Sequence, residues 1–125
     1  MTSKLIDYLY ILATIVLTAY GQVILKWRIR DFDPMPSEWG AKLGFLLSLL
    51  IDPLIFSGFA AAFLAGLAWM AAVSRFDLSH AYPFLSLNFA IVLFVSVLLL
   101  GESITWQKVA GVTLIVLGTV VASQG

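Results

Sequence analysis

The chain has 125 residues, of which 62% are hydrophobic and 11% are charged, whereas a soluble domain carries about 25% charged residues. This composition excludes an ordinary water-soluble domain, so the bilayer is the solvent expected for most of the chain. A formal net charge of zero gives no general attraction for nucleic acid, and the absence of cysteine excludes disulfides, thiolate metal sites and cysteine nucleophiles.

Four apolar runs are each long enough to cross a bilayer as a helix, which requires about 20 residues. In chain order they cover residues 5–25, 53–74, 79–100 and 106–123. A shorter apolar segment at residues 38–51, which contains a tryptophan and a lysine, is typical of a helix lying at the membrane surface. We therefore expect residues 1–125 to form one all-α membrane domain with four transmembrane helices and a short interfacial helix.

Polar residues at the starts of the predicted spans indicate helix caps. Asp52 followed by Pro53 suits the start of the second span, because aspartate accepts backbone hydrogen bonds and proline is tolerated in a first turn. Ser79 and Thr105 are candidate caps for the third and fourth spans. Pro83 lies in an early turn of the third span, and it would kink that helix if the helix began a turn sooner.

The distribution of lysine and arginine predicts the orientation of the chain. With four spans, both termini share a side with the turn between the second and third spans, and that side carries Lys4 and Arg75. The opposite side carries five basic residues: Lys26, Arg28, Arg30, Lys42 and Lys108. Since basic loops remain in the cytoplasm, we expect both termini to lie outside.

Polar side chains recur every four residues along the first span, at Thr14, Thr18, Gln22 and Lys26. This spacing places them on one ridge of a helix, running from mid-membrane to a basic end. Such a ridge is costly in lipid unless it meets other polar groups or a ligand.

The ridge ends in the sequence KWRIR, in which Lys26, Arg28 and Arg30 are expected to form a compact cationic cluster. Ammonium and guanidinium groups at a membrane surface suit a phosphate anion. The alternative is that these side chains simply extend toward the headgroup region, as basic residues at span ends commonly do.

The third span begins with the polar stretch AYPFLSLNF at residues 81–89. Tyr82, Ser86 and Phe89 share one helix face by their spacing, and Asn88 lies on a different face. Hydrogen bonding between helices is an alternative role for Ser86 and Asn88, and such bonds contribute about 0.6 kcal/mol each.

Two glycines in the fourth span, Gly111 and Gly118, are seven residues apart and form a smooth strip for close helix packing. The strip indicates packing within the monomer or a contact between subunits.

The remaining polar residues argue against catalysis. The seven carboxylates lie near span ends or in the first loop, and the single histidine lies at a span end. We find no nucleophile with a neighbouring base, no glycine-rich phosphate loop and no metal-binding spacing. The chain is therefore expected to be a non-enzyme that requires no cofactor and no metal.

Four segments together resemble the four-span, EamA-like members of the drug/metabolite transporter superfamily, in particular the small subunits that flip aminoarabinose-phosphoundecaprenol. The segments are GQVILK at 21–26, AYPFLSLNF at 81–89, GE at 101–102 and GVTLIVLG at 111–118. The resemblance implies a flippase of the bacterial inner membrane that moves a polyprenyl-phosphate-linked sugar or a similar amphipathic anion. It also implies a homodimer, or a heterodimer with a similar small subunit.

The resemblance assigns substrate-binding roles to several of the residues above. Tyr82, Ser86 and Asn88 would contact the headgroup, together with Thr18, Gln22 and the matching acidic residue Glu102. Lys26, Arg28 and Arg30 would attract the phosphate.

The sequence leaves two alternative functions open. Small multidrug exporters carry a buried glutamate where this chain has Thr18, so a proton-coupled cation exporter would lack its essential carboxylate. A membrane scaffold subunit that transports nothing is the second alternative.

Overall fold

A computed structural model describes residues 2–32 and 34–125, and within these residues the chain is helical apart from its turns. The helices are α1 (Thr2–Ile29), α2 (Trp39–Ile51), α3 (Pro53–Val73), α4 (Leu78–Leu85), α5 (Leu87–Leu99) and α6 (Trp106–Ser123). Helices α1, α3, the pair α4 and α5, and α6 provide four segments long and apolar enough to cross a membrane. The predicted all-α membrane fold is therefore confirmed.

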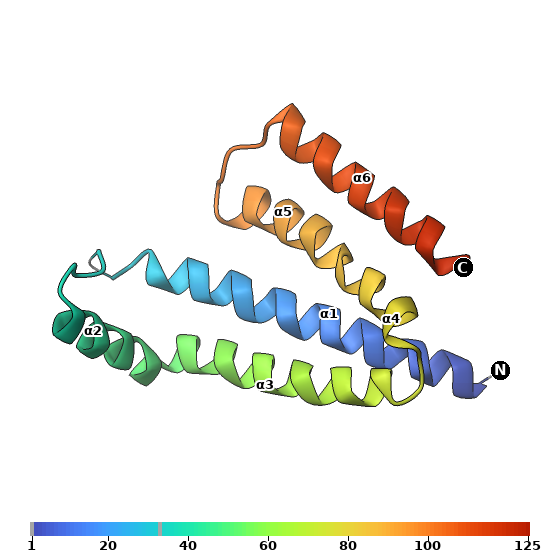
Figure 1. The fold of residues 1–125 in the computed structure, drawn as a ribbon. Coiled ribbons are helices and arrows are strands. Elements are labelled where there is room, and N and C mark those ends of the chain that lie inside the picture. The colour runs from blue at the N-terminus through green and yellow to red at the C-terminus, as the bar shows by residue number, and fades with distance from the viewer. Residues whose placement is uncertain (1, 33) are drawn as a thin grey trace.

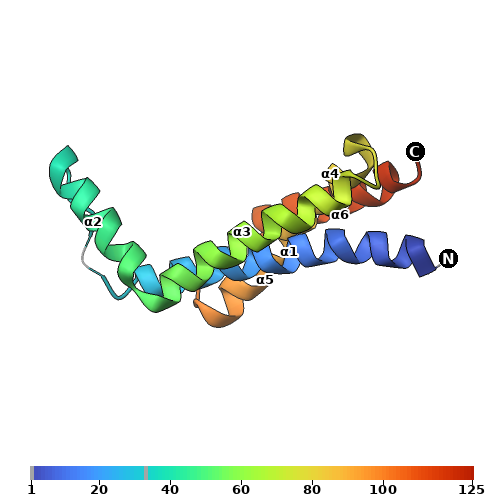
Figure 2. The same cartoon turned by 90° about the horizontal axis from the view of Figure 1, so that it is seen from below.

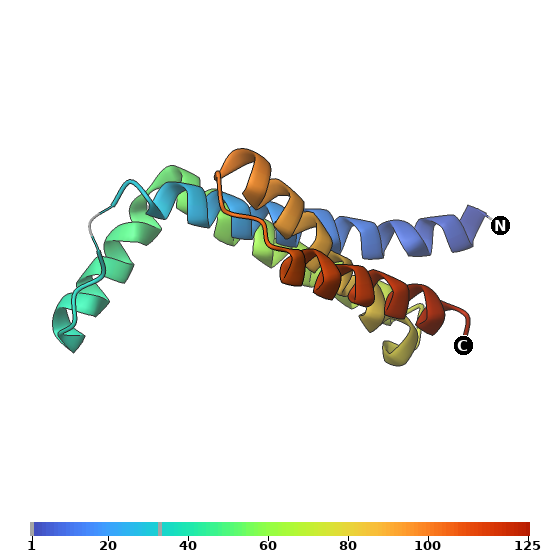
Figure 3. The ribbon, with the colours of Figure 1, turned by 90° about the horizontal axis from the view of Figure 1, so that it is seen from above.

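The spanning helices form a layered arrangement in which α1 is central (Figure 1). Helix α3 packs along α1, α5 packs against α1 on another side, and α6 packs against both α4 and α5. The two termini lie at one end of the bundle and α2 lies at the other (Figure 1 and Figure 3), as an even number of spans requires.

Helix α2 confirms the predicted short helix between the first two spans. Figure 2 shows that it turns away from the direction of the spanning helices. Trp39 and Ile51 are 84% and 80% exposed, and the Lys42 ammonium lies 4.8 Å from the centre of the Trp39 ring. An apolar helix with this orientation and these residues suits the boundary between headgroups and acyl chains.

Two of the three predicted caps are confirmed. The Asp52 carboxylate accepts hydrogen bonds from the amides of Leu54 and Ile55 at 3.0 and 3.3 Å. The Thr105 hydroxyl accepts from the amide of Lys108 at 3.2 Å. The Ser79 prediction is wrong, because α4 begins one residue earlier, at Leu78, and Ser79 lies inside the helix.

The third span is interrupted, whereas the sequence predicts one helix over 79–100. Pro83 lies inside α4, where it cannot donate a hydrogen bond to the preceding turn. The backbone hydrogen bonds around the break join residues three apart instead of four. Ser86 N donates to Pro83 O and Phe89 N donates to Ser86 O, each at 3.0 Å. The Thr119 hydroxyl of α6 lies within hydrogen-bond distance of Pro83 O, at 3.0 Å, and of Ile115 O in its own helix, at 2.9 Å, so its single proton is shared between the break and α6.

The backbones of α1 and α3 lie in close contact at Gly21 and Gly58. A Cβ atom at Gly21 would lie 2.9 Å from Gly58 O, and one at Gly58 would lie 2.9 Å from Ile24 Cγ2. A side chain at either position would push the two helices apart. This contact fixes the central helix α1 against α3 and leaves the opposite flank of α1 to face α5.

Candidate functional site

A cavity of about 660 Å³ lies between α1, α5 and α6. Its polar lining residues are Gln22, Asn88, Ser96, Glu102, Gln107 and Lys108. We call it the polar cavity. Amide, hydroxyl, carboxylate and ammonium groups line it between three spans. Such a set is unusual in lipid, because burying each of these groups in a membrane costs free energy unless the group is paired or hydrated.

Asn88 has an unsatisfied acceptor in this lining. Its Oδ1 atom is buried and has no hydrogen-bond partner among the described residues. Buried side-chain oxygens are normally paired, and this one has no partner within the described part of a single copy of the chain. The arrangement therefore leaves Asn88 able to accept a hydrogen bond from a bound hydroxyl or ammonium group.

The structure brings together some of the residues predicted from the sequence and separates others. Gln22, Asn88 and Glu102 meet in the polar cavity. Thr18 lines a smaller cavity of about 150 Å³ between α1 and α3, and Gln22 lies at its edge as well.

Tyr82 and Ser86 are not among the residues that line the polar cavity. Tyr82 is 61% exposed. The centre of its ring lies 6.1 Å from the centre of the Trp69 ring, in an edge-to-face arrangement. Asn88 does lie on a different face from Tyr82, as the spacing predicts. However, the Asn88 face is the one that packs toward α1 and α6, so it turns toward the cavity.

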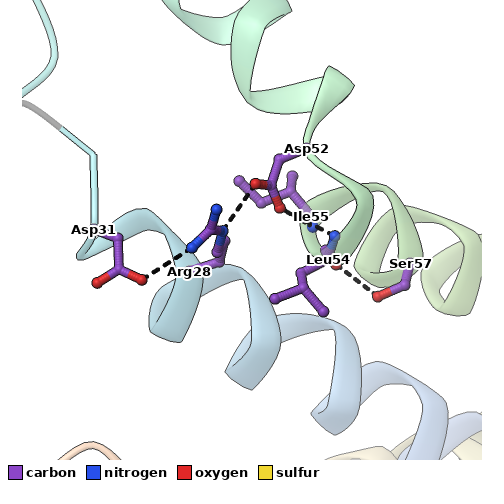
Figure 4. A network of polar contacts seen from close by, with 6 residues as sticks. All are labelled: Arg28, Asp31, Asp52, Leu54, Ile55 and Ser57. Atoms are coloured by element: carbon purple, nitrogen blue, oxygen red, sulfur yellow. Dashed lines mark hydrogen bonds and ion pairs between the residues drawn. The ribbon is translucent and has the colours of Figure 1, made fainter.

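The three basic residues at the end of α1 have different partners. Arg28 Nε donates to Asp52 Oδ2 at 2.8 Å and Arg28 Nη1 donates to Asp31 Oδ2 at 3.1 Å (Figure 4). Arg30 Nη1 instead donates to the carbonyl of Leu100 at 2.8 Å. Lys26 is exposed, and no ion pair or hydrogen bond joins it to another described residue. The positive charge of Arg28 is thus already matched by carboxylates, whereas that of Lys26 is not.

Asp52 has two structural tasks in this network, since it caps α3 and pairs with Arg28 (Figure 4). Desolvation by its surroundings raises the pKa of Asp52, but the hydrogen bonds and the positive charge of Arg28, with the two backbone amides, outweigh this effect. The pKa of Asp52 therefore lies below its ordinary value, and the carboxylate stays ionised where α1, α2 and α3 meet.

A second cavity, of about 500 Å³, lies between α1 and α5. Its walls include Tyr20, Val23 and Trp27 of α1 and Val95, Leu99 and Leu100 at the end of the third span. We call it the apolar cavity. Residues of α1 and α5 contribute to the walls of both cavities.

Three polar residues of the site were not singled out from the sequence: Ser96, Gln107 and Lys108. Ser96 follows Asn88 by eight residues, a spacing that keeps two side chains on one helix face, so its position could have been found. The other two lie in the first turn of α6 and resemble ordinary span-end residues in sequence.

No group of three or more His, Asp or Glu residues capable of holding a metal ion occurs in the part of the chain that the structure describes. The polar cavity offers a bound headgroup hydrogen-bond donors and acceptors, one carboxylate and one ammonium group.

The EamA-like transporter family matches residues 6–124 of the chain. A probable 4-amino-4-deoxy-L-arabinose-phosphoundecaprenol flippase subunit ArnF from Erwinia tasmaniensis is 37% identical over 119 residues, which cover 88% of each chain. The corresponding ArnF protein of Aeromonas hydrophila is 34% identical, with 94% of this chain and 80% of that protein covered. A probable ArnE subunit from Pseudomonas aeruginosa is 30% identical over 91% of this chain and 94% of its own. No solved structure matches.

Proposed function

This chain belongs to the EamA-like transporter family, and we propose that it moves a polyprenyl-phosphate-linked sugar, or a similar amphipathic anion, across the bacterial inner membrane. The observation that carries the proposal is the polar cavity with the unpaired acceptor of Asn88. The names of relatives that align over most of the chain support the same substrate class. No covalent step is required, so the proposed activity is transport without chemistry.

The polar cavity would hold the headgroup while the hydrocarbon tail stays in lipid. The side-chain amides of Gln22 and Asn88 would exchange hydrogen bonds with sugar hydroxyls. Glu102 would pair with a cationic amino group, such as the one named in the relatives' substrate. Lys26, one turn beyond Gln22 on the same ridge, would bind the phosphate.

We further propose that both termini face outward and that the protein works with a second small subunit, either a copy of itself or a similar chain. Lys26, Lys42 and Lys108 would then lie on the cytoplasmic side. The polar cavity would open toward the leaflet that has the greater share of basic residues. Relatives described as ArnE and ArnF are each named as subunits, which supports an assembly of two such chains.

The Asn88→Leu variant tests the proposed function. It keeps a similar volume but removes the amide, so lipid movement in proteoliposomes should fall about tenfold or more if one hydrogen bond of roughly 1.4 kcal/mol to the headgroup is lost. The melting temperature should not fall, since the leucine leaves no unpaired acceptor. The assay follows headgroup accessibility in vesicles that contain the polyprenyl-phosphate-linked sugar.

The Tyr82→Phe variant is the matched control, because Tyr82 does not line the cavity, and it should move lipid at the parental rate. If Asn88→Leu lowers stability and leaves transport intact in the folded fraction, Asn88 is a packing residue. If the parental protein moves no lipid either alone or together with a similar small subunit, the flippase proposal fails as a whole and a scaffold role is favoured.

A further inference from the structure

The stripe of α1 between the two cavities carries a basic side chain. With about 100° of rotation per residue in an α-helix, Lys26 lies roughly 40° from Gln22 and roughly 60° from Val23 around the helix. Gln22 lines the polar cavity and Val23 lines the apolar cavity. Lys26 therefore projects from the strip that separates the two.

The turn that follows α5 also contributes residues to the walls of both cavities. Leu100 lines the apolar cavity, and Glu102, two residues later, lines the polar cavity. Gly101 between them adopts a φ of +67°, and a Cβ built on it would meet no atom within 4 Å. The left-handed φ favours glycine at this turn. No other atom crowds the position where a Cβ of residue 101 would lie.

Arg30 is anchored at this turn. One of its guanidinium nitrogens donates to Leu100 O at 2.8 Å, while the side chain as a whole remains exposed. A guanidinium has five N–H donors, so most of them stay available. Arg30 therefore lies at the turn whose flanking residues line the two cavities, and Lys26 lies one turn before Arg30 on the same face of α1.

We propose that these two cations bind the phosphate of the substrate, that the sugar occupies the polar cavity, and that the first isoprene units of the polyprenyl tail occupy the apolar cavity. This assignment rests on the proposed function and adds a dedicated tail site to it. The headgroup and the start of the tail would lie on two flanks of the contact between α1 and α5.

The lining of the apolar cavity favours a polyprenyl phosphate over a membrane phospholipid. A polyprenyl phosphate has one chain per phosphate and a phospholipid has two, and one apolar cavity is lined by the same stretch of α1 that carries Lys26. Its walls offer the rings of Tyr20 and Trp27 and branched side chains such as Val23, which suit a methyl-branched chain. Because lipid tails are as apolar as the protein wall, the selectivity must come from packing.

The experiment compares two anionic lipids in phosphatidylcholine nanodiscs that contain the purified full-length protein. One is undecaprenyl phosphate and the other is dioleoyl phosphatidate, and the bound amount of each is measured by native mass spectrometry. The parental protein should prefer undecaprenyl phosphate by about tenfold, equivalent to roughly 1.4 kcal/mol. A diazirine on the first isoprene unit should crosslink to α1 or α5 at the cavity walls.

Variants separate the tail site from the phosphate site. Val23→Phe and Val95→Phe fill the apolar cavity from opposite walls and should each remove most of the preference, while phosphatidate binding stays the same. Val16→Phe makes the same change at a 54% exposed position of α1 and should keep the preference. Lys26→Met should weaken the binding of both lipids by a similar factor.

The tail assignment is overturned if the preference survives in both filled variants, or if filling the cavity weakens both lipids equally. A parental protein without any preference would show a general anionic-lipid site instead. If the preference and crosslinks appear as expected but proteoliposomes show no lipid movement, the tail site stands and the proposed transport function fails.

Discussion

Lys26 and Arg28 are separated by one residue, yet their surroundings give them different tasks. Two residues along a helix correspond to about 200° of rotation, so the side chains leave α1 on nearly opposite faces. Arg28 reaches the α2–α3 corner and pairs with Asp52 at 2.8 Å. Lys26 extends the ridge of Thr18 and Gln22 and keeps its charge available. We infer that Arg28 stabilises the fold and that Lys26 serves the ligand.

Methionine at each position tests this division, because it retains an apolar stem of similar length and deletes the charge. Lys26→Met should lower the affinity for a phosphate-bearing lipid by about 1.5–3 kcal/mol, the usual contribution of a hydrogen bond to a charged group. Its melting temperature should stay close to the parental value. Arg28→Met should lower the melting temperature, since it leaves the Asp52 carboxylate without its cation, and should leave lipid affinity nearly unchanged.

Binding and thermal unfolding are measured for both variants in the same detergent. The reverse pattern, with Arg28→Met impairing binding and Lys26→Met impairing stability, would contradict the division of roles.

At the scale of elements, the position of α1 depends on its contact with α3. The backbones meet at Gly21 and Gly58, where an added Cβ would strike a backbone oxygen or the Ile24 side chain. A backbone atom cannot rotate away as a flexible side chain can, so the helices themselves would have to shift. Such overpacking typically costs about 1–3 kcal/mol.

The two glycines Gly58 and Gly66 of α3 provide a matched comparison. Gly58→Ala should lower the free energy of unfolding by about 1–3 kcal/mol through overpacking. Gly66→Ala should raise it by about 0.5–1 kcal/mol, because alanine is the better helix former and nothing lies within 4 Å of its Cβ. Reversible unfolding in mixed micelles measures both. Equal effects of the two substitutions would mean that α1 and α3 are not tightly packed in the membrane.

The elements also show how far the sequence alone predicts this molecule. Span number, the α2 helix and the Asp52 and Thr105 caps follow from local patterns of apolar residues and short-range hydrogen bonding. The break at Ser86 follows only in part, because Pro83 is a local signal, whereas the contact of its carbonyl with Thr119 of α6 joins residues 36 positions apart in the chain.

The candidate site was predictable to a similar extent. Gln22, Asn88 and Glu102 could be selected as polar residues near or within spans, but their meeting depends on how α5 and α6 pack against α1. From the sequence, Tyr82 and Ser86 are expected at the centre of the headgroup site, because their spacing places them on one face of the third span. It could not show which face of the third span turns toward α1.

For the whole molecule, introduced cysteines test the proposed orientation in the membrane. The chain lacks cysteine, so a single introduced cysteine reports its own side. Gln124→Cys lies next to the C-terminus, and Glu38→Cys lies at the start of α2 on the opposite side; both positions are exposed. In intact cells, a membrane-impermeant maleimide should label Gln124→Cys and spare Glu38→Cys. Labelling of Glu38→Cys alone would reverse the proposed topology, and labelling of both would indicate dual topology.

The assembly of two subunits is the last prediction, and it concerns the outer surface of α6. Gly118 is exposed, and a Cβ built there meets no atom within 4 Å, so the strip is free in a single copy. Gly111 is also open, but it lines the polar cavity, so changing it would alter two features together. Gly118→Leu alone should therefore reduce the dimer fraction, because a bulky residue prevents close helix approach.

The matched control is Val120→Leu, which also introduces a leucine on α6 but lies about 200° away around the helix. The dimer fraction is measured by single-molecule photobleaching in vesicles at a fixed protein-to-lipid ratio, with lipid movement followed in the same vesicles. We expect Gly118→Leu to lower both quantities together and Val120→Leu to change neither. A monomeric Gly118→Leu protein that still moves lipid at the parental rate would show that one copy suffices. A Gly118→Leu protein that remains dimeric would place the subunit contact on another face.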